Sequence, residues 1–170
     1  MGEFTLRVAT AHDEVVVSSL LEASYTDLLR GHYSAELLSA ALPLMTKANS
    51  RLLASGTYYI AQTTDGRTIG CGGWTQEQPG TGETANGLAH IRHFATHPKW
   101  IKRGVGKTII SRCLIDIKER GISAIECYST LNGEVFYRAV GFEIVRPIKV
   151  PLTTKIGFPA ILMIRESPIG

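Results

Sequence analysis

The stretch HFATHPKWIKRGVGKTII, residues 93–110, decides how this chain folds. Its first part ends a strand-like segment, residues 88–98, that is closed by a proline. From Val105 onward, apolar residues recur with helical spacing to about residue 120, and Gly121 is suited to end that helix. The stretch therefore predicts a strand, a glycine-containing turn and a helix in direct succession.

Three cations and two glycines occupy this turn, at Lys102, Arg103, Lys107, Gly104 and Gly106. The start of a helix carries partial positive charge, which disfavours cations there. Its first N–H groups also lack partners within the helix, and glycines let a bulky anion come close to them. A bound polyanion would explain both features, so the turn predicts a phosphate-binding site. The alternative is a glycine-assisted turn with solvated lysines.

Length and composition limit what the chain can be. Its 170 residues suit one domain, 1–170, and its net charge of +3 is too small to argue for nucleic acid. No apolar stretch is long enough to span a membrane, and the N-terminal residues lack the pattern of a signal peptide. Cys71, Cys113 and Cys127 show neither metal-binding nor disulfide spacing. We therefore expect free thiols, no metal and a cytoplasmic location.

Hydrophobic periodicity and turn residues predict elements in the order β-α-α-β-β-β-α-β-α-β-β. The expected strands span residues 4–10, 57–63, 67–74, 88–98, 123–129, 142–150 and 158–166. The expected helices run from Thr10 to about Gly31, from Ser34 to about Pro43, and over about 105–120 and 132–140. Thr10 and Asp13 resemble a capping box, and Pro43 is expected to kink or end the second helix.

The residues GVGKT, 104–108, match the end of a Walker A loop, G-x-x-x-x-G-K-T. That pattern requires glycine at position 101, where this chain has isoleucine. Only about sixty residues follow, and no apolar run ending in Asp is present to hold magnesium. P-loop-type ATP binding is therefore kept only as an alternative.

The same stretch, together with LNGEVFYRAVGF at 131–142, resembles the GNAT superfamily of acetyl-CoA-dependent N-acetyltransferases. The order of expected elements resembles that family over nearly the whole chain. The family's turn pattern is Q/R-x-x-G-x-G/A, which Gly104 and Gly106 match and Ile101 does not. The resemblance implies an α/β (α+β) fold with a mixed central sheet of about seven strands. That sheet would be splayed between strands 4 and 5 and flanked by about four helices.

The resemblance also implies acetyl-CoA as a cosubstrate, without a metal. Backbone amides from Lys102 to Lys107 would hold its pyrophosphate, and the strand before them would pair with the pantetheine arm. Asn132 matches an asparagine that often contacts CoA in the family, although it could equally cap its own helix. The residues implied to bind acetyl-CoA are Phe94, Ala95, Thr96, Lys102, Arg103, Gly104, Val105, Gly106, Lys107, Asn132 and Tyr137.

Two residues take catalytic roles by the same resemblance. Tyr137 matches a tyrosine that lies near the acetyl-CoA sulfur in many members, where a phenol can protonate the departing thiolate. His90 stands in A-H-I, where histone-acetylating members have a general-base glutamate in A-E-I. An imidazole with an ordinary pKa of about 6.5 can accept an ammonium proton near neutrality. Water could relay that proton, or His90 could be a surface or packing residue with no catalytic duty, and His93 is a further candidate.

Alternation along this strand places His90, Arg92 and Phe94 on one face, unless a bulge breaks the register. Arg92 is expected to pair with a carboxylate, and orienting an acidic acceptor group is the alternative. The three cysteines lie in strand or helix patterns, so an acetyl-cysteine intermediate is not expected.

The expected reaction is direct transfer of an acetyl group from acetyl-CoA to a primary amine of a small molecule or peptide. The alternative is a module of the same fold that binds or senses acyl-CoA without catalysis. Family members hold the acceptor between the first two helices, the central loop and the chain's end. Those regions contain Tyr25, His32, Tyr33, Trp74, the loop 76–87, Lys155 and Phe158. The closing strands could pair with a second subunit as a homodimer, and nothing indicates a nucleic-acid or membrane partner.

Overall fold

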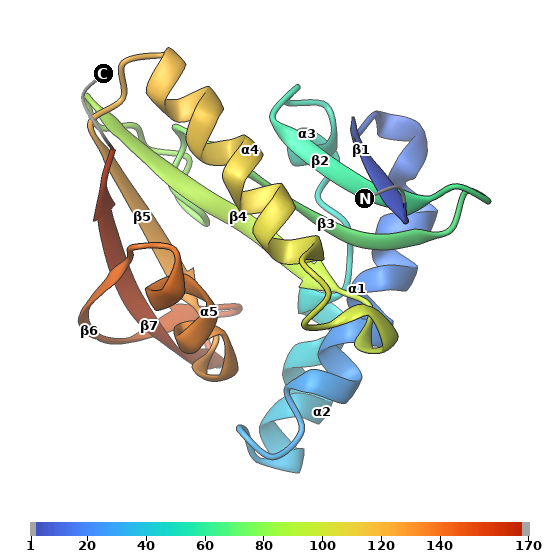
Figure 1. Ribbon diagram of the computed structural model, residues 1–170. Coiled ribbons are helices and arrows are strands. Elements are labelled where there is room, and N and C mark those ends of the chain that lie inside the picture. The colour runs from blue at the N-terminus through green and yellow to red at the C-terminus, as the bar shows by residue number, and fades with distance from the viewer. Residues whose placement is uncertain (1–2, 168–170) are drawn as a thin grey trace.

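The computed structural model of the chain describes residues 3–167, which fold around one mixed sheet of seven strands (Figure 1). The strands are β1 (Phe4–Val8), β2 (Tyr58–Thr63), β3 (Thr68–Thr75), β4 (Leu88–Thr96), β5 (Ala124–Ser129), β6 (Glu143–Pro151) and β7 (Gly157–Glu166). They lie in the order β1-β2-β3-β4-β5-β7-β6, and within these strands only β4 and β5 run parallel. The predicted sheet of about seven strands is confirmed.

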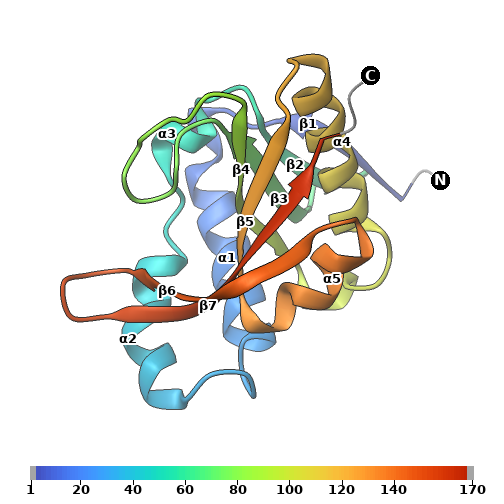
Figure 2. The same cartoon turned by 90° about the vertical axis from the view of Figure 1, so that its left-hand side faces the viewer.

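Helices cover both faces of the sheet. They are α1 (Glu14–Leu28), α2 (Ala35–Met45), α3 (Ser50–Leu53), α4 (Val105–Glu119) and α5 (Glu134–Ala139), with short 3-10 turns η1 (Ala11–Asp13), η2 (Pro98–Trp100) and η3 (Leu131–Gly133). Ile109 and Ile117 of α4 are fully buried in the core on one face of the sheet, where α5 also packs. Leu20 and Leu21 of α1 belong to a second core on the other face. Figure 2 shows the β6–β7 hairpin extending beside α2, where Phe158 joins a third buried cluster.

The helix ends follow the predicted capping residues. Thr10 and Asp13 form the expected capping box, in which the Thr10 backbone N–H donates to Asp13 Oδ2 at 2.8 Å. Ser34 caps α2 by accepting from the Leu37 N–H. The helix continues through Pro43 to Met45, so Pro43 does not end it. The four-residue helix α3 was not predicted; Asn49 caps it by accepting from the Leu52 N–H.

The predicted splay lies between β4 and β5. These strands pair only from Leu88 to His90 on β4 and from Ala124 to Glu126 on β5. Beyond His90, β4 stays paired with β3, while β5 stays paired with β7. The two strands therefore diverge, as Figure 1 shows, and leave a gap between their ends.

A β-bulge interrupts β4 at the start of this gap. Arg92 pairs with Gly73 and Ala95 pairs with Cys71, so two residues of β4 oppose one of β3. His93 takes a left-handed conformation there, with φ of 53°. Beyond the bulge Phe94 packs with the core of the α4 face, so strict alternation is wrong for it. A Cβ atom at position 72 would lie 2.5 Å from the Phe94 ring, which is why β3 has glycine at this point.

A buried polar cluster fixes α4 on the sheet. Asp116 of α4 accepts hydrogen bonds from the Trp74 indole N–H at 3.2 Å and from the Tyr59 hydroxyl. Arg112 lies one turn away and pairs with the same carboxylate at 3.3 Å. These contacts hold the helix, and with it the turn at its start, in a defined position.

The structure also bears on membrane, metal and thiol chemistry. In residues 3–167 no helix is long and apolar enough to cross a membrane. The same residues contain no group of three or more His, Cys, Asp or Glu side chains placed to hold a metal ion. Cys71, Cys113 and Cys127 are free and buried, as predicted.

Candidate active site

The turn before α4 has a backbone that requires glycine. Gly104 is the N-cap residue and has φ of 84°, in the left-handed region that favours glycine. Lys102 also lies in that region, with φ of 59°. No acidic side chain lies in the first turn of α4, so its positive end is not compensated there by the chain itself.

The start of α4 lies very close to α5 and to the end of β4. A Cβ atom at Gly106 would lie 3.2 Å from the Phe136 ring and 3.7 Å from Thr96 Oγ1. Val105 is 1% exposed and packs against Gly70, so its side chain anchors the helix in the core. At Val105 and Gly106, therefore, the backbone amides rather than side chains are available to a ligand.

The cations of the turn differ in their contacts. Lys102 and Lys107 are exposed, and within residues 3–167 neither forms an ion pair. Arg103 pairs with Glu3 at 3.0 Å, and its guanidinium lies 4.0 Å from the centre of the Trp100 ring. Both lysines remain available to an incoming anion, whereas Arg103 already has partners.

Asn132 does not cap a helix. Thr130 is the N-cap residue of η3, and Gly133 is that of α5. The Asn132 Oδ1 atom is buried and has no hydrogen-bond partner in the described chain. A buried acceptor without a partner is uncommon in folded proteins.

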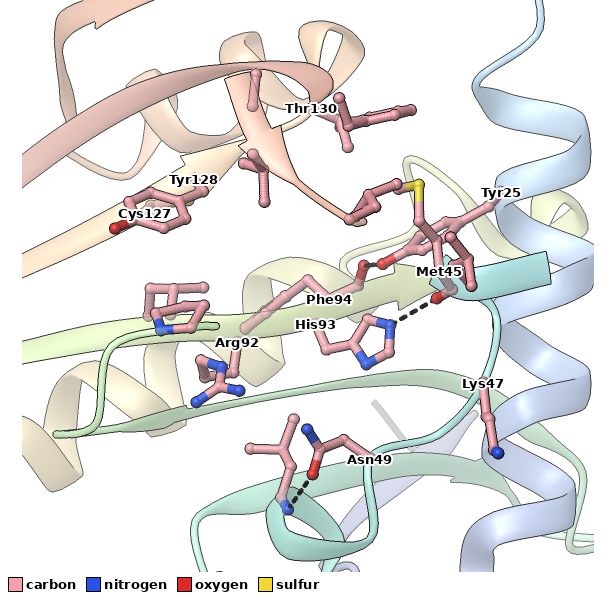
Figure 3. A pocket seen from close by; sticks show the side chains of 18 of the residues that line it. Tyr25, Met45, Lys47, Asn49, Arg92, His93, Phe94, Cys127, Tyr128 and Thr130 are labelled. Atoms are coloured by element: carbon pink, nitrogen blue, oxygen red, sulfur yellow. Dashed lines mark hydrogen bonds between the residues drawn. The ribbon is translucent and has the colours of Figure 1, made fainter. Parts of the chain in front are cut away.

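A cavity of about 350 Å³ lies where β4 and β5 separate (Figure 3). Its wall is built from α1, from α2 with the segment up to α3, from the loop before β4, from β4 after the paired residues, from β5 with the segment leading to α5, and from the β6–β7 hairpin. The residues shown with labels are Tyr25, Met45, Lys47, Asn49, Arg92, His93, Phe94, Cys127, Tyr128 and Thr130. This volume is in the range of small-molecule sites.

The peptide groups of β4 point alternately toward β3 and toward the gap. The His97 N–H donates to Ile69 O of β3, and Ala95 lies opposite Cys71 in the same ladder. Alternation therefore directs the peptide groups of Ala95 toward β3 and those of Phe94 and Thr96 toward the gap. The Phe94 carbonyl already accepts the Tyr25 hydroxyl at 2.9 Å.

Tyr137 lies on the wall of the cavity at the α5 side. It is 7% exposed, and its ring lies 6.3 Å from that of Phe94 and 5.0 Å from that of Phe136. Burial raises the pKa of Tyr137 well above its ordinary value of 10, and the neighbouring Cys127 adds to the rise. The phenol is therefore neutral at physiological pH and can donate a proton.

His90 lies at the apex of the gap, at the last paired position of β4, and does not line the cavity. It is 2% exposed, and its Nδ1 lies 3.6 Å from Glu126 Oε1 without a hydrogen-bond partner in residues 3–167. Burial lowers the pKa of His90 below 6.5, and Arg92 lowers it further. The imidazole is therefore neutral near pH 7.

Arg92 does not pair with a carboxylate in the described chain, so that prediction is wrong. Its Nη1 donates to Thr75 Oγ1 at 2.8 Å and to the Glu77 carbonyl at 3.4 Å. The next residue, His93, points into the same cavity, and its Nε2 meets the Met45 carbonyl at 2.9 Å (Figure 3).

Only some of the residues expected around the acceptor line the cavity. Tyr25 and Phe158 line the cavity, and Tyr33 stacks on Phe158 at 4.4 Å. Trp74 lies instead in the core of the α4 face. His32 and Lys155 are exposed and do not line the cavity.

Several wall residues were not expected from the sequence, namely Met45, Lys47, Asn49, Cys127, Tyr128 and Thr130. Tyr128 was detectable in principle, because it alternates with the buried residues of β5. The others carry no pattern that marks a site.

Comparisons with known proteins agree with this geometry. A sequence profile described as the acetyltransferase (GNAT) domain matches residues 54–144. No protein of curated function matches the chain by sequence.

Many solved structures share the fold. A GCN5-related N-acetyltransferase from Rhodopseudomonas palustris is 21% identical, with a TM-score of 0.78 over 98% of this chain and 97% of that one. The PaiA N-acetyltransferase from Thermoplasma acidophilum, solved with coenzyme A, is 17% identical, with a TM-score of 0.72 over 96% and 98%. The ribosomal-protein-S18-alanine N-acetyltransferase from Escherichia coli is 13% identical, with a TM-score of 0.63 over 98% and 96%.

Proposed function

Because the chain belongs to the GNAT acetyltransferase family, we propose that it transfers an acetyl group from acetyl-CoA directly to a primary amine of a small molecule or peptide. Membership makes the protein an acyltransferase, which leaves the non-catalytic and ATP-binding alternatives without support. One observation carries the specific proposal. The strands β4 and β5 separate beside a cavity with Tyr137 on its wall, and the end of β4 at Thr96 lies next to Gly106 in the glycine-rich start of α4.

The residues around the gap suit acetyl-CoA. The amides of the first turn of α4 are able to hold a diphosphate, and the absence of a side chain at Gly106 lets it approach. Lys102, Arg103 and Lys107 add positive charge there. The Asn132 Oδ1, buried without a partner, can accept from an amide or hydroxyl of the ligand. These features support the assignment of Phe94, Thr96, Lys102, Arg103, Gly104, Val105, Gly106, Lys107, Asn132 and Tyr137 to the cosubstrate site. They do not support Ala95, because its peptide groups face β3.

When bound, acetyl-CoA supplies an acetyl group activated as a thioester. In the proposed reaction the peptide N–H groups of β4 that face the gap stabilise the negative charge that develops on the acetyl oxygen. Tyr137, kept neutral by its burial, protonates the departing sulfur. His90, neutral near pH 7, accepts the proton of the attacking amine, through water because it does not line the cavity.

No cysteine is proposed as an acyl carrier. Cys127 is the only one of the three on the wall of the described cavity, and burial raises its pKa far above the ordinary value for a thiol. Burial likewise raises the pKa of Cys71 to about 12. A thiol that stays protonated is a poor nucleophile.

The test is an acetylation screen of a broad amine library with acetyl-CoA, read by mass spectrometry. We expect at least one amine to gain an acetyl group at a rate that depends on protein concentration. Acetyl-CoA binding without acetylation of any amine would contradict the proposed reaction.

Three further parts of the prediction remain proposals. The sheet includes strands from β1 to β7, which supports a single domain over residues 1–170. The edge strand β6 exposes Ile144 and Val145, which suits the predicted homodimer. The cytoplasmic location remains a prediction.

A further inference from the structure

Arg92 lines the cavity and has one hydrogen-bonding edge without a partner in the described chain. Its Nη1 is engaged by Thr75 and the Glu77 carbonyl. Within residues 3–167 its Nε and Nη2 have no hydrogen-bond partner. The N–H bonds of Nε and Nη2 run parallel along one side of a guanidinium, and this edge binds a carboxylate through two hydrogen bonds.

The charge of the cavity wall favours an anion. Lys47 and Arg92 carry positive charge, and none of the described residues that line the cavity is Asp or Glu. Two carboxylates lie close by but outside the wall. The charge of Glu77 raises the pKa of Arg92, although the two side chains form no ion pair. Glu126 faces His90. A polycationic acceptor would therefore meet repulsion inside the cavity.

The rest of the wall is largely apolar. It is lined by Leu44, Leu52, Val150, Leu152 and Phe158, among others. An acceptor that places a carboxylate on Arg92 would rest its remaining part on these side chains, where burial of apolar surface is favourable.

We propose that the acceptor is an amine that also bears a carboxylate and an apolar body, an apolar amino acid in the simplest case, and that Arg92 selects it. This inference rests on the acetyl transfer proposed above. Arg92 binds the carboxylate through Nε and Nη2 and leaves the amine free to reach the gap.

The test compares each acid with its own amide. Leucine, phenylalanine and 6-aminohexanoate are assayed beside their carboxamides, with spermidine as a polycation. We expect kcat/KM to favour the acid by about tenfold or more in at least one pair, the size of a lost charge-assisted hydrogen bond. Arg92→Gln should bring that ratio close to one with an unchanged KM for acetyl-CoA, and Arg92→Lys should keep part of it. Arg51→Gln, an exposed cation on α3 that does not line the cavity, should keep the full ratio.

Calorimetry provides a reading that does not need turnover. Each acid and amide is titrated into protein saturated with CoA. If the wild type binds the acid more tightly than the amide and Arg92→Gln loses this preference, the inference is supported. This holds even if no amine is acetylated, in which case only the proposed reaction fails. Three results would overturn the inference. They are equal binding and turnover of acid and amide, a preference for spermidine, and an acid preference that survives Arg92→Gln.

Discussion

At Gly106, α4 approaches α5 so closely that even a Cβ atom would be tightly packed. A Cβ there would lie 3.2 Å from the Phe136 ring, and a larger group would fill the space proposed for the diphosphate. We expect Gly106→Trp to raise the Kd for acetyl-CoA by about tenfold to a hundredfold, the usual effect of overpacking. Calorimetric titration measures it. Ile115→Trp, at an exposed apolar position on the same helix, is the matched control and should bind normally.

Tyr137 is the residue proposed to protonate the departing thiolate. Among the described residues the Tyr137 hydroxyl has only the Cys127 thiol, a weak hydrogen-bonding group, as a partner, so Tyr137→Phe should keep its packing against Phe94 and Phe142. We expect kcat to fall by about a hundredfold while the Kd for acetyl-CoA changes little. Steady-state kinetics with a calorimetric Kd separates the two effects. Wild-type turnover in this variant would remove the assigned role.

His90 gives the proposed reaction a pH dependence. As a base it must be neutral, and burial with Arg92 lowers its pKa below 6.5. Activity that depends on it should therefore be complete above pH 6.5 and be lost as the pH falls through the lowered pKa. The profile of kcat at saturating substrates measures this limb, and His90→Gln should abolish it. If kcat of the variant still fell at low pH as in the wild type, another group or water would accept the proton of the attacking amine.

The sequence predicts some of the site residues but not the contacts of all of them. Gly104 and Gly106 could be identified because their pattern implies a backbone conformation. In residues 3–167 the His90 Nδ1 has no hydrogen-bond partner and Arg92 pairs with no carboxylate. Both facts depend on neighbours from β3 and β5 that local sequence does not reveal.

At the scale of elements, the start of α4 carries its own prediction. Lys102 and Lys107 are exposed and without ion pairs in the described chain, so their attraction to phosphate should be screened by salt. We expect Lys102→Gln combined with Lys107→Gln to weaken acetyl-CoA binding about threefold to tenfold at low ionic strength, and much less in high salt. Titrations at two salt concentrations measure it. Lys118→Gln, at the other end of α4, should have no effect, and an equal loss at both salt concentrations would contradict the electrostatic account.

Elements with local signals were predicted well, and the exceptions have physical reasons. The Thr10–Asp13 capping box and the hairpin turn between β2 and β3 are local features, and both are present. Helix α3 was missed because four residues are too few to show periodicity. The bulge at His93 is not predictable from local sequence, because distant groups hold the left-handed histidine. Among them is the Tyr58 hydroxyl, which donates to the His93 carbonyl.

At the scale of the whole molecule, the two halves of the sheet are joined beside the gap by a short paired segment, Leu88–His90 with Ala124–Glu126. A ligand held between the halves should therefore stabilise the folded protein. At a concentration of about 100 Kd, acetyl-CoA is expected to add about 2.7 kcal/mol, or roughly 5–10 °C in Tm for a chain of this size. Thermal unfolding with and without acetyl-CoA measures the shift. ATP with magnesium should give none, and an equal shift with ATP would favour the Walker A alternative.

The overall topology was accessible from sequence because the order of elements and two motifs together specify it. The composition of the acceptor cavity was not, because its wall combines residues from α1 to β7 that are far apart in the chain. Tyr25 and Phe158, for example, meet there only after the sheet has formed.

The central claim is that the gap between β4 and β5 and the first turn of α4 together hold acetyl-CoA. A crystal structure of the protein grown with CoA tests it most directly. We predict the diphosphate on the amides of residues 102–107, the pantetheine between Phe94 and Cys127, and the sulfur beside the Tyr137 hydroxyl. An ordered CoA bound elsewhere, with this turn and gap empty, would contradict the account.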